Sequence, residues 1–231
     1  MRPAAAWIWR LAPRGPLDPP ISQNARDVDR IWHIFLYIAY GVLALVVVLV
    51  LYAVIRFRKR SDELPVQKHY NIPMEITYVV IPLLVVFGLF ALALPTEQAL
   101  GKIDPKPDLV VHVVAFQWQW RFEYPDAGVT VTGGPGSDRP ELVLPADSTV
   151  RFDLESLDVI HSFWLTSLRF KRDVIPGSPT SFSVKILDVP GAYPNAGNCA
   201  EYCGLDHGRM QFSLRVLEPA DFKAWLSQHS T

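Results

Sequence analysis

Two long apolar runs in the first half of the chain constrain its fold more than any other feature. Residues 33–55 carry no charged side chain and are long enough to cross a bilayer hydrocarbon core of roughly 30 Å. A second run extends from about residue 76 to residue 94 and ends before Pro95; a membrane helix tolerates Pro82 inside it. Two buried helices of a soluble domain are the alternative, but two such runs around a short basic loop are rare in soluble chains. We therefore expect a hairpin of two transmembrane helices.

The loop between the runs carries the basic cluster Arg56-Phe-Arg-Lys-Arg60. Positive charge beside a helix end favours the cytoplasmic side, so we expect this loop inside and both termini outside. The Pro- and Arg-rich residues 1–30, which we interpret as an irregular tail, carry charges that act against this orientation. These are Arg2, Arg10, Arg14, Arg26 and Arg30.

Beyond Pro95 the hydrophobic period changes from that of a helix to that of a strand. Residues 116–124 alternate aromatic and polar side chains, which predicts one half-buried strand. Its aromatic face would hold Phe116, Trp118, Trp120 and Phe122. Shorter alternating segments follow at residues 141–144, 149–155, 182–186 and 212–216. Short strands with Gly and Pro between them predict an antiparallel sandwich or barrel.

After these strands, Pro219 is expected to open a short helix. Its apolar stripe consists of Phe222, Trp225 and Leu226.

The formal net charge of −1 gives no support for nucleic acid binding. From residue 96 onward there are 17 acids and 12 bases, a balance of 12 − 17 = −5. An acidic domain could attract a basic partner, although ordinary solubilising charge explains the balance equally well.

The chemistry is concentrated in residues 197–210, Gly-Asn-Cys-Ala-Glu-Tyr-Cys-Gly-Leu-Asp-His-Gly-Arg-Met. Cys199, Cys203, His207 and Met210 fall within twelve residues, in a loop between two predicted strands. Soft sulfur ligands together with imidazole select copper over magnesium or calcium. A mononuclear blue-copper site uses one cysteine, so the second thiolate suits two metals bridged by two sulfurs. His161, in Asp-Val-Ile-His-Ser, is the candidate for the further imidazole.

Two other interpretations of the cysteines remain open at this point. Cys199 and Cys203 could form a disulfide on the outer side of the membrane, but a disulfide does not explain His207 and Met210. They could also bind zinc, for which Met210 is a poor ligand.

The pattern Cys-x-Glu-x-Cys-Gly-x-x-His-x-x-Met, with Asp-Val-x-His-Ser upstream, resembles subunit II of the haem-copper cytochrome c oxidases and its CuA site. The resemblance covers the chain from about residue 30 to its end. It implies an N-terminal two-helix transmembrane hairpin followed by an all-β cupredoxin-like sandwich or barrel domain. We therefore expect a tail over residues 1–30, the hairpin over 31–95 and a cupredoxin-like dinuclear copper (CuA) domain over 96–231.

The resemblance also implies a set of copper ligands. They are His161, Cys199, Glu201, Cys203, His207 and Met210. In the family the two cysteines bridge both coppers, each histidine binds one copper, the thioether is a weak ligand and the glutamate gives its backbone carbonyl. The side chain of Glu201 is further implied as a ligand of a magnesium ion shared with subunit I.

The implied function is that of subunit II of a respiratory terminal oxidase. The chain would accept electrons from cytochrome c and pass them to haem in subunit I, which reduces oxygen to water and translocates protons. Subunits I and III, cytochrome c and membrane lipid are the implied partners, in a bacterial plasma membrane, and the chain alone is an electron carrier. A membrane-tethered copper chaperone or assembly factor is the alternative. A quinol-oxidase subunit would lack the copper ligands, and all six positions are filled here.

Two residues outside the copper motif acquire roles through the resemblance. Trp118 matches the tryptophan at which electrons enter from the donor cytochrome; a place in the sandwich core is the alternative. Glu75 matches a glutamate at the mouth of a proton path into subunit I, and it can equally be a first-turn carboxylate that favours the helix dipole.

Surface residues are assigned last. Four acids could face a basic cytochrome c or form an ordinary solvated face. They are Glu123, Asp126, Glu141 and Asp158. Residues 171–177, Lys-Arg-Asp-Val-Ile-Pro-Gly, match a family segment that lies near subunit I, and we expect an interface loop there.

Overall fold

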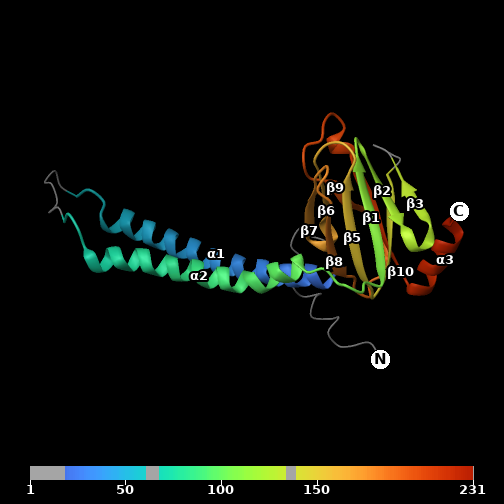
Figure 1. The fold of residues 1–231 in the computed structure, drawn as a ribbon. Helices are drawn as coiled ribbons and strands as arrows, with labels where there is room; N and C mark the ends of the chain where they lie inside the picture. The colour runs from blue at the N-terminus through green and yellow to red at the C-terminus, as the bar shows by residue number, and fades with distance from the viewer. Residues whose placement is uncertain (1–18, 61–67, 134–138, 231) are drawn as a thin grey trace, which may run out of the picture. The chain divides into compact units, whose positions relative to one another are not determined.

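The computed structural model describes residues 19–60, 68–133 and 139–230, which form two compact units (Figure 1). One unit is a helical hairpin over residues 27–100. The other combines the described residues up to 26 with the chain from residue 101 onward, and it is rich in β-strands. Residues 1–18, which include most of the expected tail, and residues 61–67 of the basic loop lie outside the described residues.

The hairpin consists of α1 (Gln23–Arg56) and α2 (Ile72–Gly101), which run antiparallel (Figure 1). Both are long and apolar enough to cross a membrane, with their apolar side chains exposed. The prediction that the second helix stops before Pro95 is wrong, because α2 continues through Pro95 to Gly101. Proline removes only one backbone donor, so a strongly apolar helix can continue through it.

The β-unit is a sandwich of two five-stranded sheets. The first sheet has the order β3-β2-β1-β5-β8, with β1 Leu109–Phe116, β2 Gln119–Tyr124, β3 Val129–Thr132, β5 Thr149–Ser156 and β8 Thr180–Lys185. The second has the order β4-β10-β9-β6-β7, with β4 Glu141–Pro145, β6 His161–Leu165, β7 Phe170–Val174, β9 Gly191–Cys199 and β10 Gln211–Leu217. The described residues of this unit also include the short 3-10 turns η2 (Pro125–Ala127), η3 (Thr166–Leu168) and η4 (His207–Arg209).

The sandwich itself confirms the expected fold class, but the sheets are not purely antiparallel. Strand β1 pairs in parallel with β5, and β4 pairs in parallel with β10. Alternation of polar and apolar residues reports which face of a strand is buried, and it is the same for both pairing directions. Strand direction therefore could not follow from the pattern.

The aromatic segment 116–124 is not one strand. Strand β1 ends at Phe116, β2 begins opposite it at Gln119, and Gln117 with Trp118 forms the two-residue turn between them. Trp120 is fully buried, as is Phe122 two residues later, whereas Trp118 is only half-buried and lies outside the core. The predicted common face is therefore wrong for the first half of the segment.

Aromatic rings from both sheets fill the interior of the sandwich. Phe163 of β6 stacks on Phe212 of β10 with ring centroids 5.1 Å apart. Trp120 from the opposite sheet meets both rings edge-on at 5.4 and 5.7 Å. Such edge-to-face pairs add about 0.5–1.5 kcal/mol each beyond the buried area. Gly197 of β9 lies directly against the ring of Phe212, so no larger residue fits there.

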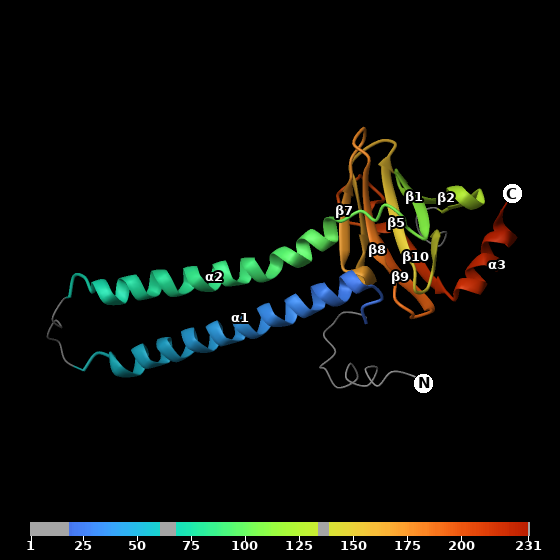
Figure 2. The same cartoon turned by 60° about the horizontal axis from the view of Figure 1, so that its bottom comes forward.

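The predicted C-terminal helix is confirmed as α3 (Pro219–His229), with Pro219 in its first turn. It packs at the β4–β10 side of the sandwich (Figure 2), where Trp225 lies 5.3 Å from the ring of Tyr124. The hydroxyl of Tyr124 in turn donates to the Val143 carbonyl oxygen and accepts from the Val143 N–H, both at 2.9 Å.

The segment before α1 belongs to the β-unit. Ile21 is 1% exposed, and its carbonyl oxygen accepts a hydrogen bond from the Leu187 N–H at 2.9 Å. Ser22 forms a β-bridge with Ile186, and its hydroxyl accepts the Ala25 N–H at 3.0 Å as an N-terminal cap of α1. These residues complete the hydrophobic core although they precede the first helix.

Candidate metal centre

The candidate ligands come from two loops at one end of the sandwich. Residues 199–210 connect β9 to β10, and the Cys199 N–H donates to the Met210 carbonyl oxygen at 2.9 Å, which closes this loop at its base. His161 begins β6, directly after the β5–β6 loop. The Ala200 N–H donates to the Ser162 carbonyl oxygen at 3.0 Å and joins the two segments.

The side-chain donor atoms converge in two pairs. The Sγ atoms of Cys199 and Cys203 lie 3.8 Å apart. Nδ1 of His161 is 3.7 Å from the Cys199 sulfur, and Nδ1 of His207 is 3.6 Å from the Cys203 sulfur. Each thiol therefore lies beside an imidazole.

Two further donors lie beside the same sulfurs. The thioether of Met210 lies 3.8 Å from the Cys203 sulfur. The carbonyl oxygen of Glu201 lies 3.3 Å from the Cys199 sulfur. All six residues that the sequence singled out are thus brought together, and His161, Cys199, Cys203 and Met210 are buried.

This geometry separates the interpretations that the spacing left open. A disulfide requires about 2.05 Å between sulfurs, so the two cysteines here are free thiols. A structural zinc site uses four donors, whereas five side chains converge on this one. Two thiols, each with an imidazole, and one thioether fit two soft metal ions that share the sulfurs.

The thiols titrate as a pair. Burial would raise the pKa of Cys199, but hydrogen bonds with His161 and neighbouring backbone groups outweigh it and lower the pKa to about 7. Burial and the adjacent Cys199 charge raise the pKa of Cys203 to about 12. Without a metal the pair therefore approaches one negative charge only above about pH 7, and binding of cations displaces the remaining thiol protons.

A carboxylate outside the ligand set orients the buried imidazole. Asp158 Oδ1 lies 2.9 Å from Nε2 of His161. Burial would raise the pKa of Asp158, but hydrogen bonds from the Gln117 N–H and from His161 hold it below its usual value. Because the ionised carboxylate can only accept, Nε2 carries a proton, which leaves Nδ1 as the ring nitrogen that can bind a metal.

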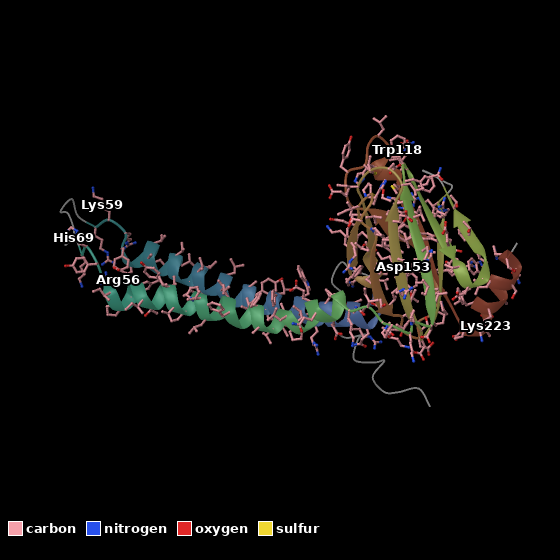
Figure 3. All side chains as sticks on the ribbon, viewed as in Figure 1. Arg56, Lys59, His69, Trp118, Asp153 and Lys223 are labelled. Carbon is pink, nitrogen blue, oxygen red and sulfur yellow. The ribbon has the colours of Figure 1, made fainter. Side chains whose placement is uncertain are left out.

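Trp118 contacts the ligand loop directly. Figure 3 marks this side chain at one end of the β-unit. Its indole Nε1 donates to the Cys203 carbonyl oxygen at 3.0 Å, and Nε2 of Gln117 donates to the same oxygen at 2.7 Å. Gly204 has φ +118°, and a Cβ there would lie 3.1 Å from the Trp118 ring. Trp120 similarly donates to the Met210 carbonyl oxygen at 3.3 Å.

Sequence reasoning missed three of these residues. Gln117 and Gly204 were not singled out, and Asp158 was considered only as a surface acid. The Asp-Val-x-His spacing was the available signal for Asp158. The contacts of the other two depend on the β1–β2 turn, which the continuous alternation concealed.

The remaining candidate acids do not gather at the metal ligands. Glu123 pairs with Nε of Arg121 at 2.7 Å, and Glu141 pairs with Nη2 of Arg215 at 2.7 Å. Asp126 lies in η2, at the opposite end of β2 from the Trp118 turn. Residues 171–177 form most of the edge strand β7 and an exposed turn after it.

Glu75 lies in the first turn of α2 and completes its N-terminal cap. Its Oε1 accepts the Asn71 N–H at 2.8 Å, while Oδ1 of Asn71 accepts the Met74 N–H at 3.4 Å. This reciprocal pattern is similar to a capping box, with the glutamate one position later than in that motif.

Comparison with known proteins agrees with both units. The family described as cytochrome C oxidase subunit II, periplasmic domain, matches residues 137–217. The family described as cytochrome C oxidase subunit II, transmembrane domain, matches residues 15–96.

Relatives and a solved structure carry the same description. The chain is 36% identical to a probable cytochrome c oxidase subunit 2 from Streptomyces avermitilis, over 96% of this chain and 81% of that protein. It is 35% identical to the Streptomyces coelicolor counterpart, over 93% and 78%. The crystal structure of the periplasmic domain of subunit II of cytochrome oxidase from Bradyrhizobium japonicum matches with a TM-score of 0.50 and 29% identity, over 55% of this chain and 96% of that one.

Proposed function

Because this chain belongs to the cytochrome c oxidase subunit II family, we propose that it accepts electrons from cytochrome c at a dinuclear copper centre and passes them to haem in subunit I. The family is part of a haem-copper terminal oxidase, an oxidoreductase complex in which the chain is one subunit. The observation that carries the copper proposal is the pair of thiols 3.8 Å apart, with an imidazole nitrogen 3.7 Å from one sulfur and another 3.6 Å from the second.

The proposed ligands are the six residues that converge at the end of the sandwich: His161, Cys199, Glu201, Cys203, His207 and Met210. A copper pair held by these residues would take up and release one electron. The protein supports this by preforming the loop, since the Cys199–Met210 and Ala200–Ser162 backbone hydrogen bonds do not involve a metal. Four of the six ligand residues are buried, which reduces the access of water and limits solvent rearrangement around the site.

Partners follow from the same assignment. Subunit I would receive the electron and subunit III would complete the complex, while Trp118 would be the residue at which electrons enter from cytochrome c. Its support is the hydrogen bond between the half-buried indole and the Cys203 carbonyl oxygen. Glu201 would have two roles. Its carbonyl oxygen lies in the metal centre, and its exposed side chain could bind a magnesium ion shared with subunit I.

The two long apolar helices make this a membrane protein, consistent with the transmembrane family that matches residues 15–96. For its orientation, we take the copper domain and both termini to be on the outer side of a bacterial plasma membrane. The basic residues at the end of α1, among them Arg56 and Lys59 (Figure 3), support an inner location for the loop between the helices.

The copper chaperone alternative is not favoured. A chaperone would hold one labile ion at few, accessible ligands. Here the thiol of Cys199 is only 7% exposed and that of Cys203 only 3%, and both belong to a set of five converging side chains.

The test is electron paramagnetic resonance of the full-length chain in detergent, loaded with copper and half reduced. We expect hyperfine structure from one electron shared by two equivalent copper nuclei, with about two coppers per chain by elemental analysis. Cys203→Ser should abolish the shared signal. A spectrum from a single copper, or tight binding of one silent Cu(I), would refute the proposal and favour the chaperone. The full chain is needed because Ile21 and Ser22 complete the core of the β-unit.

A further inference from the structure

The β1–β2 turn is bonded to both loops that supply metal ligands. The main-chain N–H of Gln117 donates to Asp158 Oδ2 at 2.6 Å, in the β5–β6 loop. The side-chain amide of the same residue donates to the Cys203 carbonyl oxygen at 2.7 Å, in the β9–β10 loop. One residue therefore links two loops that are far apart in the sequence.

The link continues to the buried imidazole through the second oxygen of the carboxylate. Asp158 Oδ1 accepts a hydrogen bond from Nε2 of His161 at 2.9 Å and another from the Val159 N–H at 2.6 Å. The result is an unbroken series of hydrogen bonds from His161 through Asp158 and Gln117 to Cys203.

We propose that Gln117 and Asp158 are positioning residues that fix the imidazole of His161 relative to Cys203 for metal binding. The proposal rests on the proposed copper function and assigns to this chain two residues that are not ligands. Asp158 orients the ring, and Gln117 fixes the carboxylate to the opposite ligand loop.

The chemistry of the carboxylate makes the arrangement specific. Asp158 receives three N–H groups, from Gln117, Val159 and the His161 ring, and only an acceptor with two oxygens satisfies all of them. An asparagine has one oxygen and one NH₂ group. If its oxygen accepted from Gln117, its NH₂ would face Nε2 and favour the ring tautomer whose proton is on Nδ1, where the metal must bind.

The same contacts argue against Asp158 as a free docking acid. Both of its oxygens are engaged in hydrogen bonds, and one of these reaches a fully buried ring. A docking acid acts through its charge on the association rate of a partner, and its loss would leave the metal centre unchanged.

The experiment compares four variants of the full-length chain in detergent, each loaded with Cu²⁺. They are Asp158→Asn, Gln117→Leu, the double variant, and the control Gln119→Leu. Gln119 is the matched control because it lies on the other side of Trp118 at the start of β2. The rate of copper release to a chelator and the spectrum of the half-reduced centre are measured for each, with thermal unfolding of the copper-free chains as a check on folding.

We expect Asp158→Asn to accelerate copper release by about tenfold to a hundredfold, the usual effect of losing the partner of a ligating histidine. Gln117→Leu should accelerate it by about threefold to tenfold, the equivalent of one lost hydrogen bond. Because the two residues act in series, the double variant should release copper little faster than Asp158→Asn. The electron should also become unequally shared between the two coppers, while Gln119→Leu behaves as wild type.

The outcomes separate this inference from the function on which it rests. A wild-type chain with no two-copper spectrum would overturn both. A wild-type two-copper spectrum, with unchanged release and spectra in the variants, would overturn only the positioning roles. Fully additive effects in the double variant would also overturn the linked action of Gln117 and Asp158.

Discussion

The indole nitrogen of Trp118 donates a hydrogen bond of 3.0 Å to the carbonyl oxygen of Cys203, a proposed bridging ligand. A half-buried ring at the surface is thus one hydrogen bond from the metal centre.

Replacing Trp118 by Phe should slow electron uptake from reduced cytochrome c by about thirtyfold, with copper content unchanged. This is the effect expected from the loss of a tryptophan hot spot of about 2 kcal/mol. Stopped-flow kinetics on the assembled oxidase measure this, with the exposed Trp164 of β6 as the control in Trp164→Phe. Normal uptake in Trp118→Phe would contradict the assignment.

Gly204 allows this contact. Its φ of +118° strains any other residue, and a Cβ would lie 3.1 Å from the Trp118 ring. Gly204→Ala should lower the free energy of unfolding by about 1–3 kcal/mol through backbone strain. It should also slow electron uptake, because the indole must move away from Cys203. Gly208→Ala is the control, since nothing lies within 4 Å of its added methyl group, and it should change stability by less than about 0.5 kcal/mol. Equal behaviour of the two variants in urea unfolding would contradict this explanation.

Ile21 should stabilise the β-unit although it precedes the first helix. Because it is 1% exposed, Ile21→Ala should lower the free energy of unfolding by about 2–5 kcal/mol. Ile175→Ala provides a matched control, since Ile175 is 41% exposed and its truncation should cost less than about 0.5 kcal/mol. Chemical unfolding of the full chain in detergent, followed by tryptophan fluorescence, measures both. If Ile21→Ala were as stable as Ile175→Ala, the segment would not belong to the core.

Tyr124 should make the fold sensitive to alkali. Burial raises its pKa above the usual value of about 10, so the folded chain keeps a proton that the unfolded chain loses. Stability is therefore complete below about pH 10 and falls above it, by about 1.4 kcal/mol per pH unit from this group. Tyr124→Phe should remove this contribution to the slope. At neutral pH the Tyr124→Phe substitution should lower the free energy of unfolding by about 1–3 kcal/mol, because the Val143 N–H and carbonyl lose their hydrogen-bond partner. Urea unfolding between pH 8 and about pH 11.5 measures both effects. If the unfolding free energy of Tyr124→Phe fell above about pH 10 as steeply as that of the wild type, the buried tyrosine would not be the cause of the alkali sensitivity.

Glu75 combines a structural contact with a proposed role in proton uptake. Glu75→Gln keeps an oxygen for the Asn71 N–H and removes the charge, whereas Glu75→Ala removes both. If the carboxylate belongs to a proton path, both variants should slow oxygen reduction in the assembled oxidase and leave copper content intact. Normal turnover in Glu75→Gln, with a loss only in Glu75→Ala, would reduce its role to the helix cap.

Much of this architecture could be predicted from the chain alone, because it depends on local properties. The charge-free run of residues 33–55 is long and apolar enough to predict a membrane-spanning helix, and it forms most of α1. The ligand types and their spacing over residues 199–210 predicted a loop rich in soft donors, and the structure brings those donors together. Segments such as Phe212–Val216 alternated between core and surface as expected.

The failures share a physical cause. The aromatic alternation continued through the Gln117–Trp118 turn because Phe116 and Trp118, which lie outside the core, occupy even positions like the buried Trp120. The turn in fact moves the core face from odd positions in β1 to even positions in β2, and the aromatic pattern concealed this change. Parallel pairing of β1 with β5 and the burial of Ile21 depend on residues distant in the sequence.

The amino-acid sequence by itself determined the two apolar helices, the β-rich domain and the loop of soft donors over residues 199–210, since each is encoded in the type and spacing of neighbouring residues. Only the tertiary structure decided that each thiol lies beside an imidazole and that Asp158 accepts a hydrogen bond from His161. It also decided that Trp118 and Gln117 donate hydrogen bonds to the Cys203 carbonyl oxygen. Those relationships join separate loops, and the distance between loops is set by how the two sheets pack.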